Sequence, residues 1–154
     1  MELTKKEAFI RQLAVYIGDD DFGKAYELAQ VFVKRFPGEM LAHFLLARAA
    51  FGILRYEEAK SEARKAFNMS KTYDDMLATA LLASTAHLEL KEYAQGYGLL
   101  KEMEKRGDSA ELQTALAVFS LAQRDAKELI SHLDRLHRLN EKLALEMAMR
   151  IVKG

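Results

Sequence analysis

The chain has 154 residues, half of which are apolar, so it can bury a sizeable core, and this excludes a disordered chain. Lysine plus arginine and aspartate plus glutamate number 23 each, and this balance leaves no net field that would attract nucleic acid or an anionic membrane surface. The absence of cysteine excludes disulfide bonds, thiolate catalysis and cysteine-bound zinc.

The start of the chain gives no sign of export. Charged residues interrupt what would be the apolar part of a secretory signal, namely Lys5, Lys6, Glu7 and Arg11. The longest nearly uncharged run, residues 76–88, is too short to cross a bilayer as a helix. We therefore expect a cytoplasmic protein with no membrane segment.

Every segment has apolar residues at helical spacing, which predicts an all-α chain. The first helix is expected to begin at Thr4, whose hydroxyl can cap it while Glu7 bonds back, and to end at Ile17. The second is expected to begin after Asp21 and to end before Pro37, because the residue before a proline disfavours helix.

A third helix is expected over residues 39–52 and a fourth over residues 56–69. Small residues predominate where these two helices would face each other, and small residues allow two helices to approach closely. The expected seam is Leu46, Ala47, Ala50, Ala59 and Ala63.

Side chains that can cap helices mark the starts of four of the remaining helices. The expected caps are Thr72, Asp108, Asp125 and Asn140. Gly107 can adopt the left-handed conformation that ends the sixth helix near Arg106. The ninth and last helix is expected over residues 141–152.

Two segments share one register at a distance of 34 residues. Residues 21–25 align with residues 55–59, so that Phe22 corresponds to Tyr56 and Ala25 to Ala59. A fixed period of this length, with each repeat containing two helices joined by a turn, predicts an α-solenoid of antiparallel helix pairs.

These features resemble the tetratricopeptide repeat, which has an aromatic residue and an alanine early in each second helix, an alanine seam and a proline at the end. The resemblance places repeats at 6–39, 40–73, 77–110 and 110–143, in one domain of residues 1–154 that ends in the capping helix. The tryptophan usual early in such a repeat is absent. The resemblance implies a right-handed superhelix of about nine helices.

The resemblance also implies a concave groove lined by the first helix of each repeat. The corresponding residues are Ile10, Ala14, Ile17, Phe44, Arg48, Phe51, Leu81, Thr85, Leu88, Thr114, Val118 and Leu121. The lysines and asparagines with which some family members clamp acidic C-terminal tails are missing. An apolar groove suits a peptide or an amphipathic helix, anchored by Phe44 and Phe51, with Arg48 as its one charge. The alternative is that Phe44 and Phe51 only pack between adjacent repeats.

The ninth helix has apolar residues on more than one side. If one side covers the eighth helix, Leu145, Met149 and Val152 stay exposed, and they could form a homodimer interface or meet another partner. The alternative is that this helix is buried on both sides between the seventh and eighth helices.

No catalytic or metal-binding motif is present. The histidines at 43, 87, 132 and 137 form no pair at i, i+4, and His43 and His87 are expected to be hydrogen-bonded core residues. We therefore expect no enzyme activity, no metal and no cofactor, and a scaffold that binds a protein partner. The alternatives are a small secretion-type chaperone and a structural or assembly subunit acting as a homo-oligomer.

Overall fold

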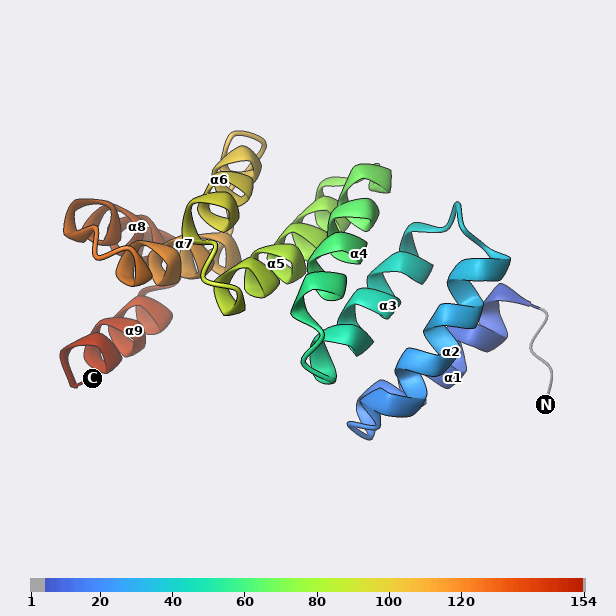
Figure 1. Ribbon diagram of the computed structural model, residues 1–154. Coiled ribbons are helices and arrows are strands. Elements are labelled where there is room, and N and C mark those ends of the chain that lie inside the picture. The colour runs from blue at the N-terminus through green and yellow to red at the C-terminus, as the bar shows by residue number, and fades with distance from the viewer. Residues whose placement is uncertain (1–4, 154) are drawn as a thin grey trace. The chain divides into compact units, whose positions relative to one another are not determined.

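The computed structural model describes residues 5–153, and within this range it contains nine α-helices and no strand (Figure 1). The helices are α1 (Lys6–Gly18), α2 (Phe22–Arg35), α3 (Met40–Gly52), α4 (Tyr56–Met69), α5 (Tyr73–Glu89), α6 (Tyr93–Glu104), α7 (Ala110–Ala122), α8 (Ala126–Leu139) and α9 (Glu141–Lys153). This architecture confirms the predicted all-α class.

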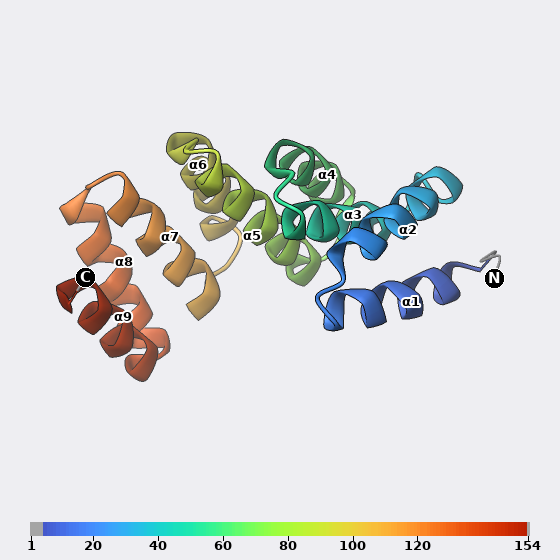
Figure 2. The same cartoon turned by 60° about the horizontal axis from the view of Figure 1, so that its bottom comes forward.

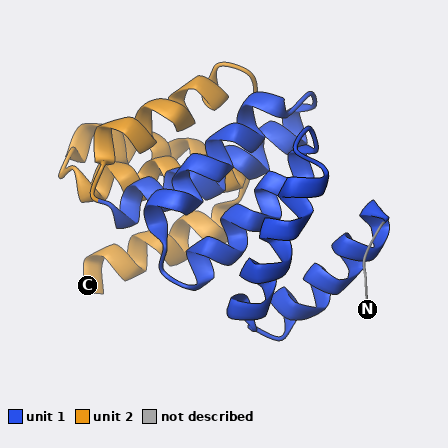
Figure 3. Cartoon of the chain, turned by 45° about the vertical axis from the view of Figure 1, so that its right-hand side comes forward, with its two compact units in different colours: residues 1–90 blue, residues 91–154 orange. Residues whose placement is uncertain are grey.

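The chain forms two compact units, which Figure 3 shows in different colours: unit 1 is residues 1–90 and unit 2 is residues 91–154. In unit 1, each of the helices α1 to α4 packs against the next one along the chain, and α3 also contacts α5. In unit 2, α6 packs on α7, α7 on α8, and α8 on α9, and Figure 2 shows α8 and α9 side by side. Contacts between successive helices are the packing pattern of a helical repeat.

The alanine seam between α3 and α4 is buried as expected. Ala47, Ala50, Ala59 and Ala63 are fully buried and Leu46 nearly so. Because these side chains are small, the two helix backbones can approach to the short end of the usual range of about 8 to 10 Å. The hairpin of α1 and α2 is filled by larger groups instead: the rings of Phe9 and Phe32 stack with their centroids 4.9 Å apart.

The turn inside each helix pair contains one residue in the left-handed region. These residues are Asp20, Leu54, Lys91 and Arg124, at intervals of 34, 37 and 33 residues. In the first turn, the N–H of Asp21 donates to the carbonyl of Tyr16 and that of Asp20 to the carbonyl of Ile17. This is the Schellman arrangement that ends a helix, and the same pair of bonds recurs in the turns at Leu54 and Arg124.

No glycine in residues 5–153 has a positive φ, so the expectation that Gly107 adopts the left-handed conformation is wrong. The last turn of α6 closes through the N–H of Gly107, which donates to the carbonyl of Met103 over 3.2 Å. Residues other than glycine hold the left-handed positions. The turn there gives hydrogen bonds to the last carbonyls of the helix, and this gain outweighs the steric cost of a side chain.

Most of the expected caps are present. Asp21, Thr72, Asp125 and Asn140 each accept a hydrogen bond from a backbone N–H three residues on. The start of α7 differs, because Ser109 caps it while Asp108 accepts from the Gln113 side chain. The proposed cap at Thr4 lies outside the described residues, and α1 begins at Lys6.

We predict that Ala59→Leu lowers the free energy of unfolding by about 1 to 3 kcal/mol, because the added carbons must be accommodated in a seam that leaves Ala59 no exposed surface. Urea unfolding followed by circular dichroism measures the change. Ala94→Leu, at an exposed position of α6, is the control and is expected to change little. Equal effects of the two substitutions would contradict the tight seam.

We predict that Leu54→Gly raises the free energy of unfolding by about 0.5 to 1 kcal/mol. Leu54 has a φ of 66° and is 70% exposed, so glycine removes the steric cost of this backbone conformation and gives up little burial. Thermal unfolding of the two proteins is the measurement. Ile53→Gly, one residue earlier with a negative φ of −101°, is the control and is expected to destabilise. A destabilised Leu54→Gly protein would show that the side chain matters more than the backbone there.

Candidate functional site

The residues predicted to line a groove all keep part of their surface accessible. Ala14, Thr85 and Leu121 are exposed, and the other nine positions are intermediate. Their neighbours on the same helices are buried; in α3, for example, Leu46 and Ala50 lie in the core. Each first helix thus leaves its predicted positions partly accessible.

Arg48 in α3 is held by an aromatic ring of unit 1. Its guanidinium lies over the ring of Phe22, 4.8 Å from the centroid. The same ring covers Gly52, where a Cβ atom would come within 2.2 Å of it, so any larger residue would force the ring to move. Such a cation–π contact stabilises by about 0.5 to 1 kcal/mol at an accessible site.

The two phenylalanines of α3 pack between helices of unit 1. Phe51 meets the ring of Tyr56 edge-on at 5.2 Å and packs against the buried cluster of Ala50, Ala59 and Ala86. Phe44 borders a hollow of about 90 Å³ that is also lined by Ala78 and Thr79 of α5. Both rings therefore take part in packing, as the alternative interpretation expected, and both keep an accessible part.

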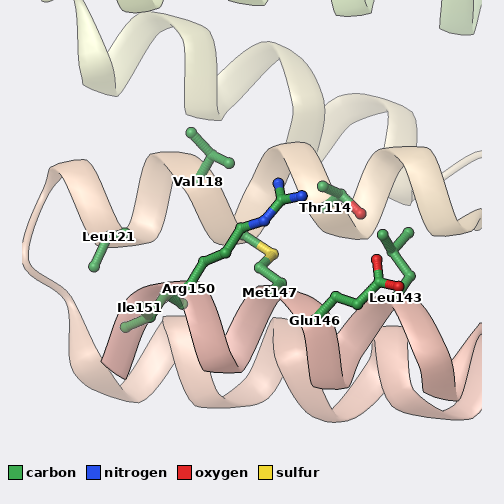
Figure 4. A pocket seen from close by; sticks show the side chains of 8 residues that line it. All are labelled: Thr114, Val118, Leu121, Leu143, Glu146, Met147, Arg150 and Ile151. Atoms are coloured by element: carbon green, nitrogen blue, oxygen red, sulfur yellow. The ribbon is translucent and has the colours of Figure 1, made fainter. Parts of the chain in front are cut away.

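Unit 2 contains an apolar pocket of about 470 Å³ between α7 and α9 (Figure 4). Three predicted groove positions in α7, namely Thr114, Val118 and Leu121, form one wall. The other wall comes from α9 and consists of Leu143, Glu146, Met147, Arg150 and Ile151. The structure thus brings these three predicted residues together around one pocket.

Two opposite charges lie at the α9 side of this pocket. In Figure 4 the guanidinium of Arg150 extends toward Thr114 and Val118, and the carboxylate of Glu146 lies near Leu143. The remaining lining is apolar apart from the Thr114 hydroxyl, which donates to the carbonyl of Ala110. A pocket of this kind can hold an apolar side chain while the two charges orient polar groups beside it.

The residues of the α9 wall are not among those predicted from the sequence, which indicates either a cap over α8 or a helix buried between α7 and α8. The repeat register contains a signal for this wall. The left-handed residues Lys91 and Arg124 are 33 residues apart. The same offset relates Thr114 to Met147 and Val118 to Ile151. Helix α9 therefore continues the register as one more first helix.

A buried polar network joins α6, α7 and α8 in unit 2. The Nδ1 of His132 lies 2.8 Å from the Oε1 of Gln113, and its Nε2 lies 2.8 Å from the Tyr97 hydroxyl, which donates to Glu128. The Gln113 amide donates to Glu104 over 2.7 Å. Each polar group buried here has a partner, which is what a polar cluster in a core requires.

Burial and charge shift three pKa values in this network. Burial lowers the pKa of His132, with the charge of Glu104 opposing. Burial and the hydrogen bond to Glu128 raise the pKa of Tyr97 to about 12. Burial acts to raise the pKa of Glu104, but the hydrogen bonds from Lys101 and Gln113 outweigh it and hold the pKa at about 2.

The network is a structural feature of the core. His132 is almost fully buried, so no substrate reaches the imidazole, and its bonds hold three helices together. His43 is a comparable core residue in unit 1: it contacts the Glu62 carboxylate at 2.6 Å and the Pro37 carbonyl at 2.8 Å. His87 accepts from Arg64, so both predictions of hydrogen-bonded core histidines are confirmed.

Comparison with solved structures identifies the fold. A thermophilic tetratricopeptide-repeat protein of Thermus thermophilus superimposes with a TM-score of 0.77 over 97% of this chain and 81% of its own, at 18% identity. The chain has a tetratricopeptide-repeat fold. This confirms the resemblance seen in the sequence. No family model and no curated protein matches the sequence.

The described part of the chain offers neither a metal centre nor a membrane span. Over residues 5–153, no three histidine, aspartate or glutamate side chains gather where they could hold a metal ion. Within the same range, the helices are all too short or too polar to span a bilayer.

We predict that acid destabilises the fold in two steps. The pKa of His132 is lower in the folded protein than its ordinary value of 6.5, so its contribution to stability is present above pH 6.5 and falls as the pH drops below it. The pKa of Glu104 is lowered from 4.5 to about 2, so its contribution is lost between these values. Urea unfolding at a series of pH values measures both steps. His132→Gln should flatten the first step and keep the second; an unchanged first step would contradict the assignment.

Proposed function

We propose that this chain is a non-catalytic scaffold that binds a peptide or amphipathic helix of a partner protein along its first helices. The pocket between α7 and α9 carries this proposal, because it joins the predicted positions Thr114, Val118 and Leu121 into a concave apolar surface. An apolar pocket of a few hundred Å³ with a small number of polar groups is typical of a binding site.

The charges of the pocket suggest which ligand fits. Glu146 and Arg150 are one helical turn apart on α9, so a bound segment with a basic group next to Glu146 and an acidic group next to Arg150 would be oriented by both. An amphipathic helix satisfies this with one apolar anchor and two flanking charges on the same side. In unit 1 the accessible parts of Phe44 and Arg48 offer a second contact area of the same kind.

A peptide selected against the purified protein from a displayed library tests this. We predict that Leu121→Glu weakens its binding at least about tenfold, equivalent to about 1.4 kcal/mol, because a carboxylate would be buried in an apolar wall. Fluorescence anisotropy with labelled peptide is the measurement. Val31→Glu is a matched control, since Val31 on α2 and Leu121 are both 43% exposed.

The groove in unit 1 needs a different substitution. Phe51 packs against Tyr56 and the buried alanine cluster of α3, α4 and α5, so its replacement by glutamate would also destabilise unit 1. Phe44→Glu is therefore the variant of choice for that unit. If neither Leu121→Glu nor Phe44→Glu changes peptide binding, the binding surface lies outside the first helices.

A further inference from the structure

The two walls of the pocket in unit 2 run in the same direction. Figure 4 shows Thr114 and Leu121 along α7 in the same order as Leu143 and Ile151 along α9. The dipoles of the two helices therefore point the same way. A third helix laid against both walls is favoured in the antiparallel direction, because each of its ends then lies beside wall ends of opposite partial charge.

The two charges of this pocket have no counter-charge in the described part of the chain. Within residues 5–153, neither Glu146 nor Arg150 forms an ion pair. Their spacing of four residues would allow them to pair with each other, as Asp134 and Arg138 do on α8, where the charged atoms are 2.9 Å apart. In Figure 4, Arg150 instead extends toward α7. Both charges are therefore available to a bound ligand.

We propose that Glu146 and Arg150 select the direction of the bound helix. The helix lies antiparallel to α7 and α9, with an acidic residue beside Arg150 and, four residues later, a basic residue beside Glu146. This inference rests on the proposed function, because it names the kind of helix that the same pocket binds. Four residues are about one turn in both helices, so the two pairs of charges meet at the same height. Apolar residues on the same side of the ligand contact Val118 and Ile151.

The order of acid before base also suits the ligand itself. An acidic residue four positions before a basic one stabilises an isolated helix more than the reverse order does. A ligand with the reverse order would match the two charges only when it lies parallel to the walls. In that direction both its own helix and the arrangement of the dipoles are less favourable.

Two lysines of α9 lie beyond the two charges. Lys153 is in the last turn with Arg150, and it adds positive charge at the end where the acidic residue of the ligand lies. Lys142 is exposed one turn before Glu146 and does not line the pocket. A parallel ligand with acid before base would pair with Lys142 and Glu146 only after moving one turn toward the start of α9. This shift would take its apolar residues away from Ile151, so the pocket favours the antiparallel ligand.

The first experiment measures the preferred order of charges. A displayed library of helical peptides, with two positions four residues apart restricted to glutamate or lysine, is selected against the purified protein. We expect glutamate before lysine to be enriched. A synthetic peptide with this order should bind about three- to tenfold more tightly than the same peptide with the two residues exchanged, as measured by fluorescence anisotropy.

Exchanging the charges of the protein tests whether these two residues cause the preference. The double variant Glu146→Arg with Arg150→Glu should abolish it, because each charge of the antiparallel ligand then meets a like charge. The matched control is Asp134→Arg with Arg138→Asp, an exchange at the same spacing on the exposed surface of α8, and it should leave the preference unchanged.

The second experiment determines the direction of the bound peptide. The chain has no cysteine, so an introduced thiol is the only one. Lys142→Cys and Lys153→Cys each place a thiol at one end of the α9 wall, and both positions are exposed. Because a disulfide requires Cα atoms within about 7 Å, a peptide with an N-terminal cysteine should crosslink to Lys153→Cys, and one with a C-terminal cysteine to Lys142→Cys. Lys127→Cys, exposed on α8, is the control and should crosslink to neither.

The outcomes separate this inference from the proposed function. Crosslinks in the opposite combination, or a preference that the double variant leaves unchanged, would overturn the direction while peptide binding in the pocket still holds. Selected peptides whose binding Leu121→Glu does not weaken would contradict the pocket as the binding site, and this inference with it.

Discussion

The close approach of the two helices in each pair is the constraint on which the other features depend. Five residues after the left-handed residue of each of the first three turns stands a buried small residue, Ala25, Ala59 or Gly96. A small residue here lets the second helix lie against the first, and the hydrogen bonds of the turn fix where the second helix begins. In the fourth pair the larger residue Leu129 holds this position. The requirement for a small residue is therefore not met in the helix pair that contains the polar network.

Much of the fold could be predicted because its determinants are local. Helix periodicity, most caps and the seam through Ala59 depend on residues within one helix pair, and each of these predictions is confirmed by burial or a hydrogen bond. The error at Gly107 has a different origin: glycine tolerates a positive φ but does not require it, and the turn geometry decides. The α9 wall of the pocket was missed because it depends on where a terminal helix docks. The repeat register, extended by 33 residues, contained that information.

Polar pairs in the core distinguish alternate repeats. His43 and Glu62 are hydrogen-bonded 19 residues apart in α3 and α4, and Gln113 and His132 form a pair at the same spacing in α7 and α8. The equivalent positions of the other two helix pairs hold Phe9 with Leu28 and Ala80 with Leu99. Because an unpaired buried polar group is costly, such a pair is satisfied only when two helices meet in one register. The paired histidines thus specify how their helices align, where apolar residues alone would tolerate a shift.

Within residues 5–153, α9 packs on α8, and its side at Leu145, Met149 and Val152 is exposed. A helix that packs on one side unfolds locally more easily than a helix that packs on two sides. The fraction of molecules in which α9 is docked therefore sets the affinity for any ligand that binds the docked helix. A peptide in the pocket would contact both α7 and α9, so its binding would also stabilise the docked position of α9, without any rearrangement of the helices before it.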